Sequence, residues 1–161
     1  MNLLTLNLHA PLEWSAAATM GTVAEALTAA DAAPDGAEIV MRWDWSAAFD
    51  ETGDDGPRAS KPFPEPSRMA ASRHDPSATP SDDGQSPAER LEPGRYLFAQ
   101  ARIAPSDDGT AHDGSSARLA ELVEWFAREA WWTKAAMEGP LVVRLVREDG
   151  KTAVQPLRRL V

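Results

Sequence analysis

The chain has 161 residues, a length that suits one domain with one substantial core. It contains no cysteine, which excludes disulfides, thiolate chemistry and cysteine-ligated zinc. Its formal net charge of −9 disfavours global attraction to nucleic acid or anionic lipid, and no apolar run reaches the ~20 residues that a membrane helix requires. We therefore expect a cytoplasmic protein without a membrane partner.

The N-terminal part predicts a strand followed by a helix. Leucines alternate with polar residues over 2–9, which is the period of a half-buried strand. Thr22 and Glu25 have the spacing of a capping box, so we expect a helix to begin there and to end before Pro34.

The character of the sequence changes after a second predicted strand. Residues 38–45 alternate and place Trp43 and Trp45 on one face, where we expect both to be core residues. Residues 50–92 are then rich in proline, serine and aspartate and have few large apolar side chains. Such a segment does not recover the entropy cost of ordering, so we expect a flexible insertion at 50–92 within a single α+β domain, 1–161.

The strongest pattern in the chain is an amphipathic helix over 115–137. It follows a predicted strand at 95–103 and a polar loop, and its expected stop is Gly139-Pro140. Apolar residues recur at helical spacing and define the face that we expect to be buried. These residues are Leu119, Leu122, Val123, Phe126, Ala130 and Met137.

Two tryptophans of this helix lie away from its apolar face. Trp125 and Trp132 are seven residues apart, on the side that also carries Glu121 and Arg128, whereas Trp131 borders the apolar face and is expected in the core. An indole buries roughly 150–250 Å² and is costly to leave in water. We expect either that another part of the chain covers the two rings or that they anchor a partner.

The C-terminal part predicts a strand at 141–147, a tight turn at 148–151 and a last strand at 152–160. Asp-Gly favours a type I′ hairpin turn, and Pro156 indicates an edge strand because proline donates no ladder hydrogen bond. The expected fold is α+β, with a four- to five-stranded, mostly antiparallel sheet and two helices on one face. The expected order is ferredoxin-like, β-α-β-β-α-β, extended by the C-terminal hairpin.

The candidate ligand or metal site is the loop before the long helix. It contains Asp107, Asp108, His112 and Asp113, and a histidine beside carboxylates at a helix N-terminus can act as a general base or share a metal. The alternative is a solvated loop in which Asp113 caps the helix. The three Asp-Asp-Gly tripeptides lack the spacing of an EF-hand and are interpreted as turns.

Two further features concern anions. The C-terminal arginines Arg144, Arg147, Arg158 and Arg159 form the candidate anion-facing surface of an otherwise acidic chain. Together with Tyr96 and Phe98 on the predicted strand at 95–103, they define an alternative role in nucleic-acid binding, which the net charge and the absence of an RNA-recognition signature disfavour.

The sequence favours a non-enzymatic interaction or accessory module. The chain lacks the common nucleotide, hydrolase and metalloprotease motifs, and we expect no cofactor. The expected partner is another protein or a second copy of the chain, bound through the Trp125/Trp132 helix face or the C-terminal edge strand. The alternative is a small enzyme or ligand-binding domain that uses residues 107–116.

Overall fold

A computed structural model describes residues 2–17, 22–61, 63–74, 89–103 and 113–161. Within them lies one large sheet whose strands all pair antiparallel. Its strands are β1 (Leu4–Leu8), β2 (Leu12–Ala17), β3 (Glu38–Trp43), β6 (Arg68–His74), β7 (Glu89–Leu91), β8 (Gly94–Phe98), β9 (Ala101–Ile103), β10 (Met137–Glu148) and β11 (Lys151–Leu160). The helices are α1 (Val23–Ala32), α2 (Trp45–Ala48) and α3 (Asp113–Trp132), and β4 (Phe49–Asp50) pairs with β5 (Arg58–Ala59) in a small separate sheet.

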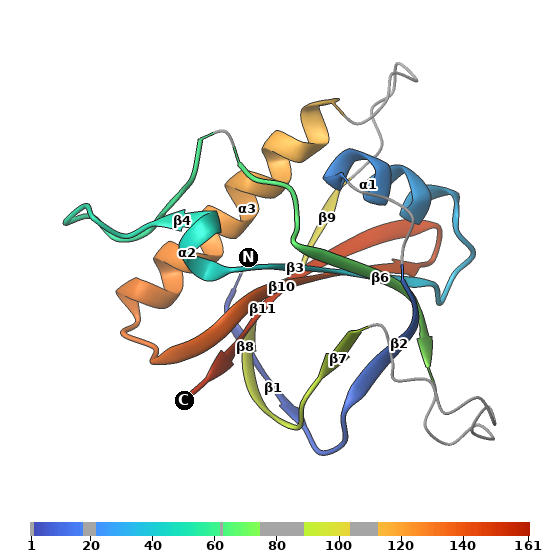
Figure 1. Cartoon of the computed structure of the whole chain (residues 1–161), viewed down its shortest axis with the longest axis horizontal. Helices are drawn as coiled ribbons and strands as arrows, with labels where there is room; N and C mark the ends of the chain where they lie inside the picture. Colours follow the sequence, from blue (N-terminus) through green and yellow to red (C-terminus); the bar gives the residue numbers. More distant parts are fainter. Residues whose placement is uncertain (1, 18–21, 62, 75–88, 104–112) are drawn as a thin grey trace.

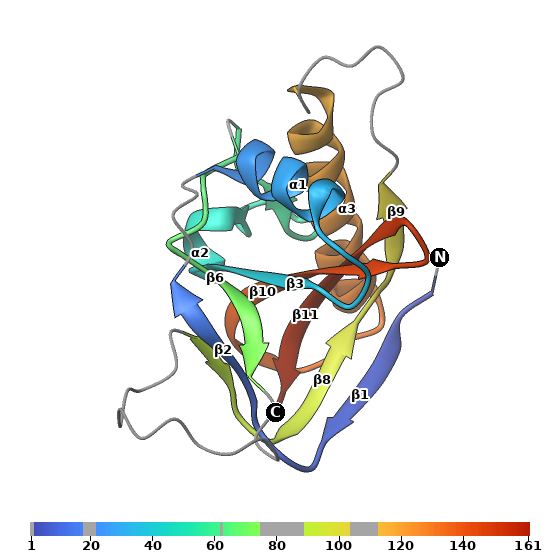
Figure 2. The ribbon, with the colours of Figure 1, turned by 90° about the vertical axis from the view of Figure 1, so that its right-hand side faces the viewer.

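The large sheet closes on itself. Its strand order is β1-β8-β11-β10-β3-β6-β2-β7, with β9 beside β11. The chain passes from β1 to β2 through residues 9–11 and from β7 to β8 through residues 92–93, while β1 pairs with β8 and β2 with β7. The two ends of the order are therefore the two halves of one bent pair of segments, β1–β2 beside β7–β8, and the strands surround an interior (Figures 1 and 2).

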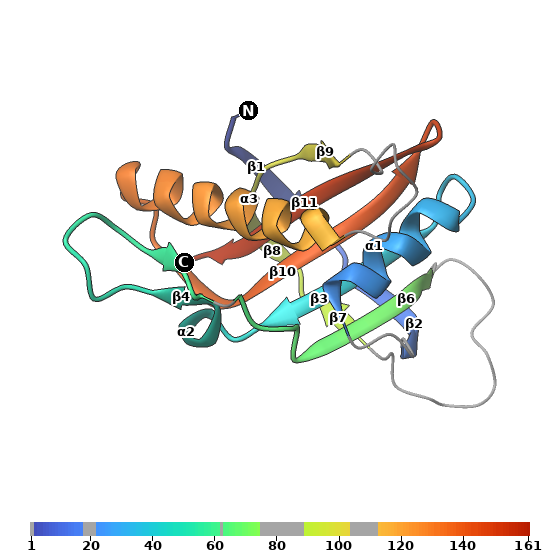
Figure 3. The same ribbon diagram turned by 90° about the horizontal axis from the view of Figure 1, so that it is seen from above.

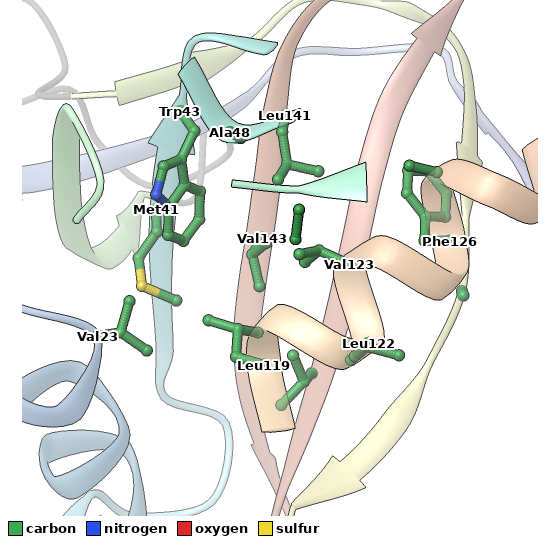
Figure 4. Close-up of a cluster of buried hydrophobic side chains, with 14 of the residues drawn as sticks. Val23, Met41, Trp43, Ala48, Leu119, Leu122, Val123, Phe126, Leu141 and Val143 are labelled. Carbon is green, nitrogen blue, oxygen red and sulfur yellow. The ribbon is translucent and has the colours of Figure 1, made fainter. Parts of the chain in front are cut away.

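This closure gives the strands β3 and β10 two buried faces, because alternate side chains point to opposite sides of a strand. One face meets the helices, which Figure 3 shows lying together over the sheet. The resulting cluster is called the helix-side core. Its central side chains, drawn in Figure 4, include Val23, Met41, Trp43, Leu119, Val123, Phe126, Leu141 and Val143.

The other face points into the interior of the closed sheet. The buried side chains there form a smaller cluster, called the enclosed core. They are Leu12, Trp14, Val40, Ala70, Leu91, Tyr96, Val142 and Leu157. Burial on both faces explains why β3 and β10 are apolar along most of their length.

The predicted N-terminus of α1 is confirmed. The Glu25 amide donates to the Thr22 hydroxyl oxygen at 3.1 Å, and that hydroxyl in turn donates to the Glu25 carboxylate at 3.1 Å. A carboxylate oxygen of Glu65 accepts from the Val23 amide at 2.7 Å. The segment 50–92 thus supplies a second anion to the positive end of this helix.

The predicted end of α3 is wrong. The helix stops at Trp132, and Met137 already belongs to β10, where it pairs with Leu160. Lys134 has a φ of 58°, and the amides of Ala135 and Lys134 donate to the carbonyls of Ala130 and Trp131. This is a Schellman ending with lysine at the position that usually holds glycine, so the sequence lacked its ordinary signal.

The α+β class and the antiparallel sheet are confirmed, but the ferredoxin-like order is not. The sheet has nine strands rather than four or five. The sequence predicted a flexible insertion at 50–92, yet β6 lies between β3 and β2, and β7 pairs with β2. Residues 75–88 of that segment lie outside the described residues.

The C-terminal hairpin is confirmed, whereas the edge prediction is wrong. Asp149 and Gly150 have φ values of 51° and 73°, as a type I′ turn requires. The strand β11 has β10 on one side and both β8 and β9 on the other. Pro156 is tolerated because it lies between the parts of β11 that pair with β9 and with β8.

No helix in the described part of the chain combines the length and the apolar character of a membrane span.

Candidate functional site

The aromatic pair exposed on α3 differs from the predicted one. Trp125 is half-buried against the helix-side core, whereas Trp132 is 65% exposed and Trp131 is 43% exposed. The rings of Trp131 and Trp132 meet edge to face, with 5.0 Å between their centroids. Of the other predicted interaction residues, Glu121 is exposed and Arg128 is half-buried.

Trp131 was expected in the core, and a loop covers it only in part. Gly56 lies against the Trp131 ring so closely that a Cβ at this glycine would be 2.9 Å from Cε3. Gly56 also has a φ of +97°, a conformation that few other residues adopt. The loop between β4 and β5 therefore shields one side of Trp131, while Trp132 stays open to solvent.

The exposure of this pair contrasts with the other tryptophans. Trp14, Trp43 and Trp45 are all buried. The indole nitrogens of Trp43 and Trp45 donate to the Pro64 carbonyl and the Glu51 carboxylate, each at 2.8 Å. Trp131 and Trp132 are thus the aromatic surface that this fold leaves uncovered among its described residues.

The candidate ligand or metal loop cannot be assembled from the described residues. Asp107, Asp108 and His112 lie outside them, and Asp113 is placed only as the first residue of α3. Among the side chains that the structure describes, no group of three or more His, Cys, Asp or Glu could hold a metal ion. The loop stays a prediction.

The four candidate anion-facing arginines separate into two pairs. Arg144 forms an ion pair with Glu38 and donates to the Gln155 side chain at 3.2 Å. The guanidinium of Arg147 lies 3.6 Å from the Asp31 carboxylate and donates to the Thr152 hydroxyl at 3.2 Å. This first pair is therefore engaged with partners in the same chain.

Arg158 and Arg159 instead line a pocket of about 320 Å³ near the C-terminus marked in Figure 1. Two arginines that the sequence analysis missed, Arg42 of β3 and Arg90 of β7, line the same pocket. The only signal for Arg42 was its place on the polar side of the alternating segment 38–45. Leu91, Tyr96 and Val142 belong both to the pocket and to the enclosed core, so the pocket opens at one end of the closed sheet.

Several of the charges at this end are already neutralised. Arg42 forms an ion pair with Glu89, whose side chain is only 4% exposed. The Arg90 guanidinium lies 3.0 Å from the Glu92 carboxylate and 3.4 Å from that of Glu13. These ion pairs hold Arg42 and Arg90 in the lining of the pocket.

The remaining two arginines have fewer protein partners. The Arg158 guanidinium lies over the Trp45 ring, 3.8 Å from its centroid, and its Nε donates to the Gly139 carbonyl at 2.9 Å. Burial lowers the pKa of Arg158, and the Glu51 carboxylate opposes that shift. The exposed guanidinium of Arg159 forms no hydrogen bond or ion pair with the residues that the structure describes, although its backbone pairs with β10 and β8.

Of the aromatic residues proposed for nucleic-acid stacking, Tyr96 is buried and Phe98 is half-buried. Tyr96 is buried in the enclosed core, Phe98 packs against that core, and the Tyr96 hydroxyl donates to the Glu92 carbonyl at 2.7 Å. Burial raises the pKa of Tyr96, an effect that the nearby Arg159 partly offsets. Neither ring forms an open stacking surface.

No protein-family model matches this sequence, and no curated protein is significantly similar to it.

Proposed function

We propose that this protein is a non-enzymatic protein–protein interaction module whose contact surface is centred on Trp131 and Trp132. The observation that carries the proposal is the 65% exposure of Trp132 beside a partly exposed second indole. Solvent-exposed indoles leave a large apolar area in water, and tryptophan is enriched at the energetic centres of protein interfaces.

The surroundings of the pair support this role. Polar side chains border it on the helix and in the turn that follows, including Arg128, Glu129 and Lys134. An apolar centre with a polar rim is the usual arrangement of an interface. The Schellman ending also fixes the helix end, so the two rings are presented from a defined backbone.

The partner is a protein chain, either a second copy of this one or a different polypeptide. A light-scattering mass of the purified protein separates the two. If the chain self-associates, the mass should exceed that of one chain and fall to the monomer value in Trp132→Ala, with an unchanged melting temperature because the ring is exposed. The matched control is Leu4→Ala, which removes another exposed apolar side chain, on β1.

If the protein is monomeric, a photo-crosslinking residue at position 132 should capture a defined protein species in cell extract. The same residue at position 4 should not capture that species. A monomer that yields no position-specific adduct would rule out the proposed interface.

A further inference from the structure

The pocket at the open end of the enclosed core is locally cationic although the whole chain is acidic. Its charged lining residues are Arg42, Arg90, Arg158, Arg159, Glu92 and Glu138. The lining alone has four arginines and two glutamates, and two glutamates outside it, Glu89 and Glu13, pair with Arg42 and Arg90. Arg158 and Arg159 are therefore the two lining arginines without a carboxylate partner among the described residues.

Arg158 is positioned by contacts within the protein, whereas Arg159 is exposed. The Arg158 guanidinium is stacked on Trp45 and tethered to the Gly139 carbonyl through Nε. The Arg159 guanidinium lies against Gly94, where a Cβ would be 3.3 Å from both its Nε and its Nη2. A planar guanidinium that is held in advance loses less conformational entropy when it binds an anion.

The pocket also has hydrogen-bonding capacity that the described residues do not use. The buried Nε of Arg42, a lining residue, and the buried Oε2 of its ion-pair partner Glu89, which lies outside the lining, have no hydrogen-bond partner among these residues. The exposed guanidinium of Arg159 forms no hydrogen bond or ion pair with them. Buried polar atoms without partners are rare in native proteins, so this end of the molecule is suited to a polar occupant.

We propose that the pocket binds a small organic anion with one carboxylate group and a compact apolar body. The guanidiniums of Arg158 and Arg159 donate to the carboxylate, whose two oxygens match their planar donor geometry. The apolar body lies against Leu91, Pro140 and Val142. A single carboxylate can be shared by the two arginines that have no carboxylate partner, whereas a polyphosphate would bring more negative charge beside Glu92 and Glu138.

The experiment is a titration of the full chain with benzoate, a carboxylate on a compact ring, followed by calorimetry. We expect binding with a dissociation constant on the order of 1 mM or below. Arg159→Gln should weaken it about tenfold or more, since it removes charge-assisted hydrogen bonds. The matched control is Arg58→Gln, which changes the same charge on an exposed arginine outside the pocket and should leave the affinity unchanged.

Benzamide, which has the same ring without the charge, and inorganic phosphate complete the experiment. Weak or undetectable binding of both, beside clear binding of benzoate, supports the carboxylate site. Phosphate that binds more tightly than benzoate would overturn the carboxylate assignment. The proposed site would be wrong if Arg58→Gln and Arg159→Gln lowered the benzoate affinity equally, or if the folded wild-type protein did not bind benzoate. Because Trp131 and Trp132 do not line this pocket, the result is independent of the proposed interface.

Discussion

The two cores of this molecule are built differently, although β3 and β10 contribute to both. The helix-side core consists of apolar side chains, and beside it the buried Thr152 hydroxyl donates to the Asp31 carboxylate of α1 at 2.6 Å. The enclosed core is smaller, and the two buried carboxylates Glu38 and Glu89 occur on strands that surround it, each paired with an arginine. The interior of the closed sheet has room for only a few side chains, and the two carboxylates buried there are neutralised by arginines. The closed sheet therefore buries paired charge, whereas the buried polar side chain on the helix side is the uncharged Thr152.

The largest expected effect is in the helix-side core. Phe126→Ala should lower the free energy of unfolding by about 3–5 kcal/mol, because the fully buried ring leaves a cavity that its rigid neighbours cannot fill. Denaturant unfolding measures the change. A loss below about 1 kcal/mol would show that the helix layer packs loosely and would remove the contrast between the two cores.

A matched pair of leucines compares the two cores directly. Leu119 and Leu157 are both fully buried, the first on α3 and the second opposite Val142 in the enclosed core. Each change to alanine should lower the free energy of unfolding by about 2–5 kcal/mol. The decrease for Leu157→Ala should be smaller by about 1 kcal/mol, because its cavity would adjoin the pocket beside Val142 and relax more easily. The two unfolding curves are compared in the same buffer. A greater loss for Leu157→Ala would contradict the view that the enclosed core is the more adaptable one.

Arg42 and Glu89 at the enclosed core should matter to stability as an ion pair, so that removing one partner costs more than removing both. Glu89→Gln should destabilise the fold by about 1–3 kcal/mol, since the Arg42 guanidinium would lose its anionic partner. Replacing both residues, as in Arg42→Met with Glu89→Leu, should restore most of the lost stability. Arg42→Met and Glu89→Leu, made singly and together, form a double-mutant cycle. A double variant as unstable as the sum of the single variants would show that the two residues act independently.

The smallest expected effect is on the response of the enclosed core to alkaline pH. Burial raises the pKa of Tyr96 above its ordinary value of 10.0, so the folded chain keeps the phenolic proton where the unfolded chain has lost it. Stability is therefore intact below pH 10 and is lost as the pH rises through the folded pKa. Tyr96→Phe loses the hydrogen bond to the Glu92 carbonyl, so its stability should be lower at neutral pH. Its stability should not show this further decline as the pH rises.

Tyr96 is the only tyrosine in the chain, so the ultraviolet absorbance of tyrosinate reports its pKa directly. A pKa at or below that of a free tyrosine would contradict the burial of the ring. An equal alkaline decline in wild type and Tyr96→Phe would assign the decline to other groups.

The predictable elements are those with a strong local pattern. The leucine alternation over 2–9, the Thr22/Glu25 capping box, the apolar face of α3 and the Asp149-Gly150 turn all lie where expected. The strands β2 and β6 were missed because the residues that pair them are small, such as Ala16, Ala17, Ala70 and Ala71, and show no clear apolar period. Small residues become strand only when neighbouring strands supply the hydrogen bonds and the packing surface.

The candidate sites show the same limit. Arg158 and Arg159 were candidates for an anion-facing surface from composition, but Arg42 and Arg90 join them only because β3, β7 and β11 meet around one interior. Trp131 and Trp132 have similar sequence surroundings, yet their exposures differ because a loop containing Gly56 lies over one ring. Local spacing does not record which distant segment covers a side chain.

The sequence by itself determined the class of the fold, the long amphipathic helix, one helix cap and one hairpin turn, since each depends on residues within a few positions of one another. Only the tertiary structure decided that the sheet closes, that Pro156 lies in an interior strand, and which indoles and arginines reach the surface. Those outcomes depend on pairing between segments far apart in the chain, where hydrogen bonds and burial outweigh the preferences of individual residues.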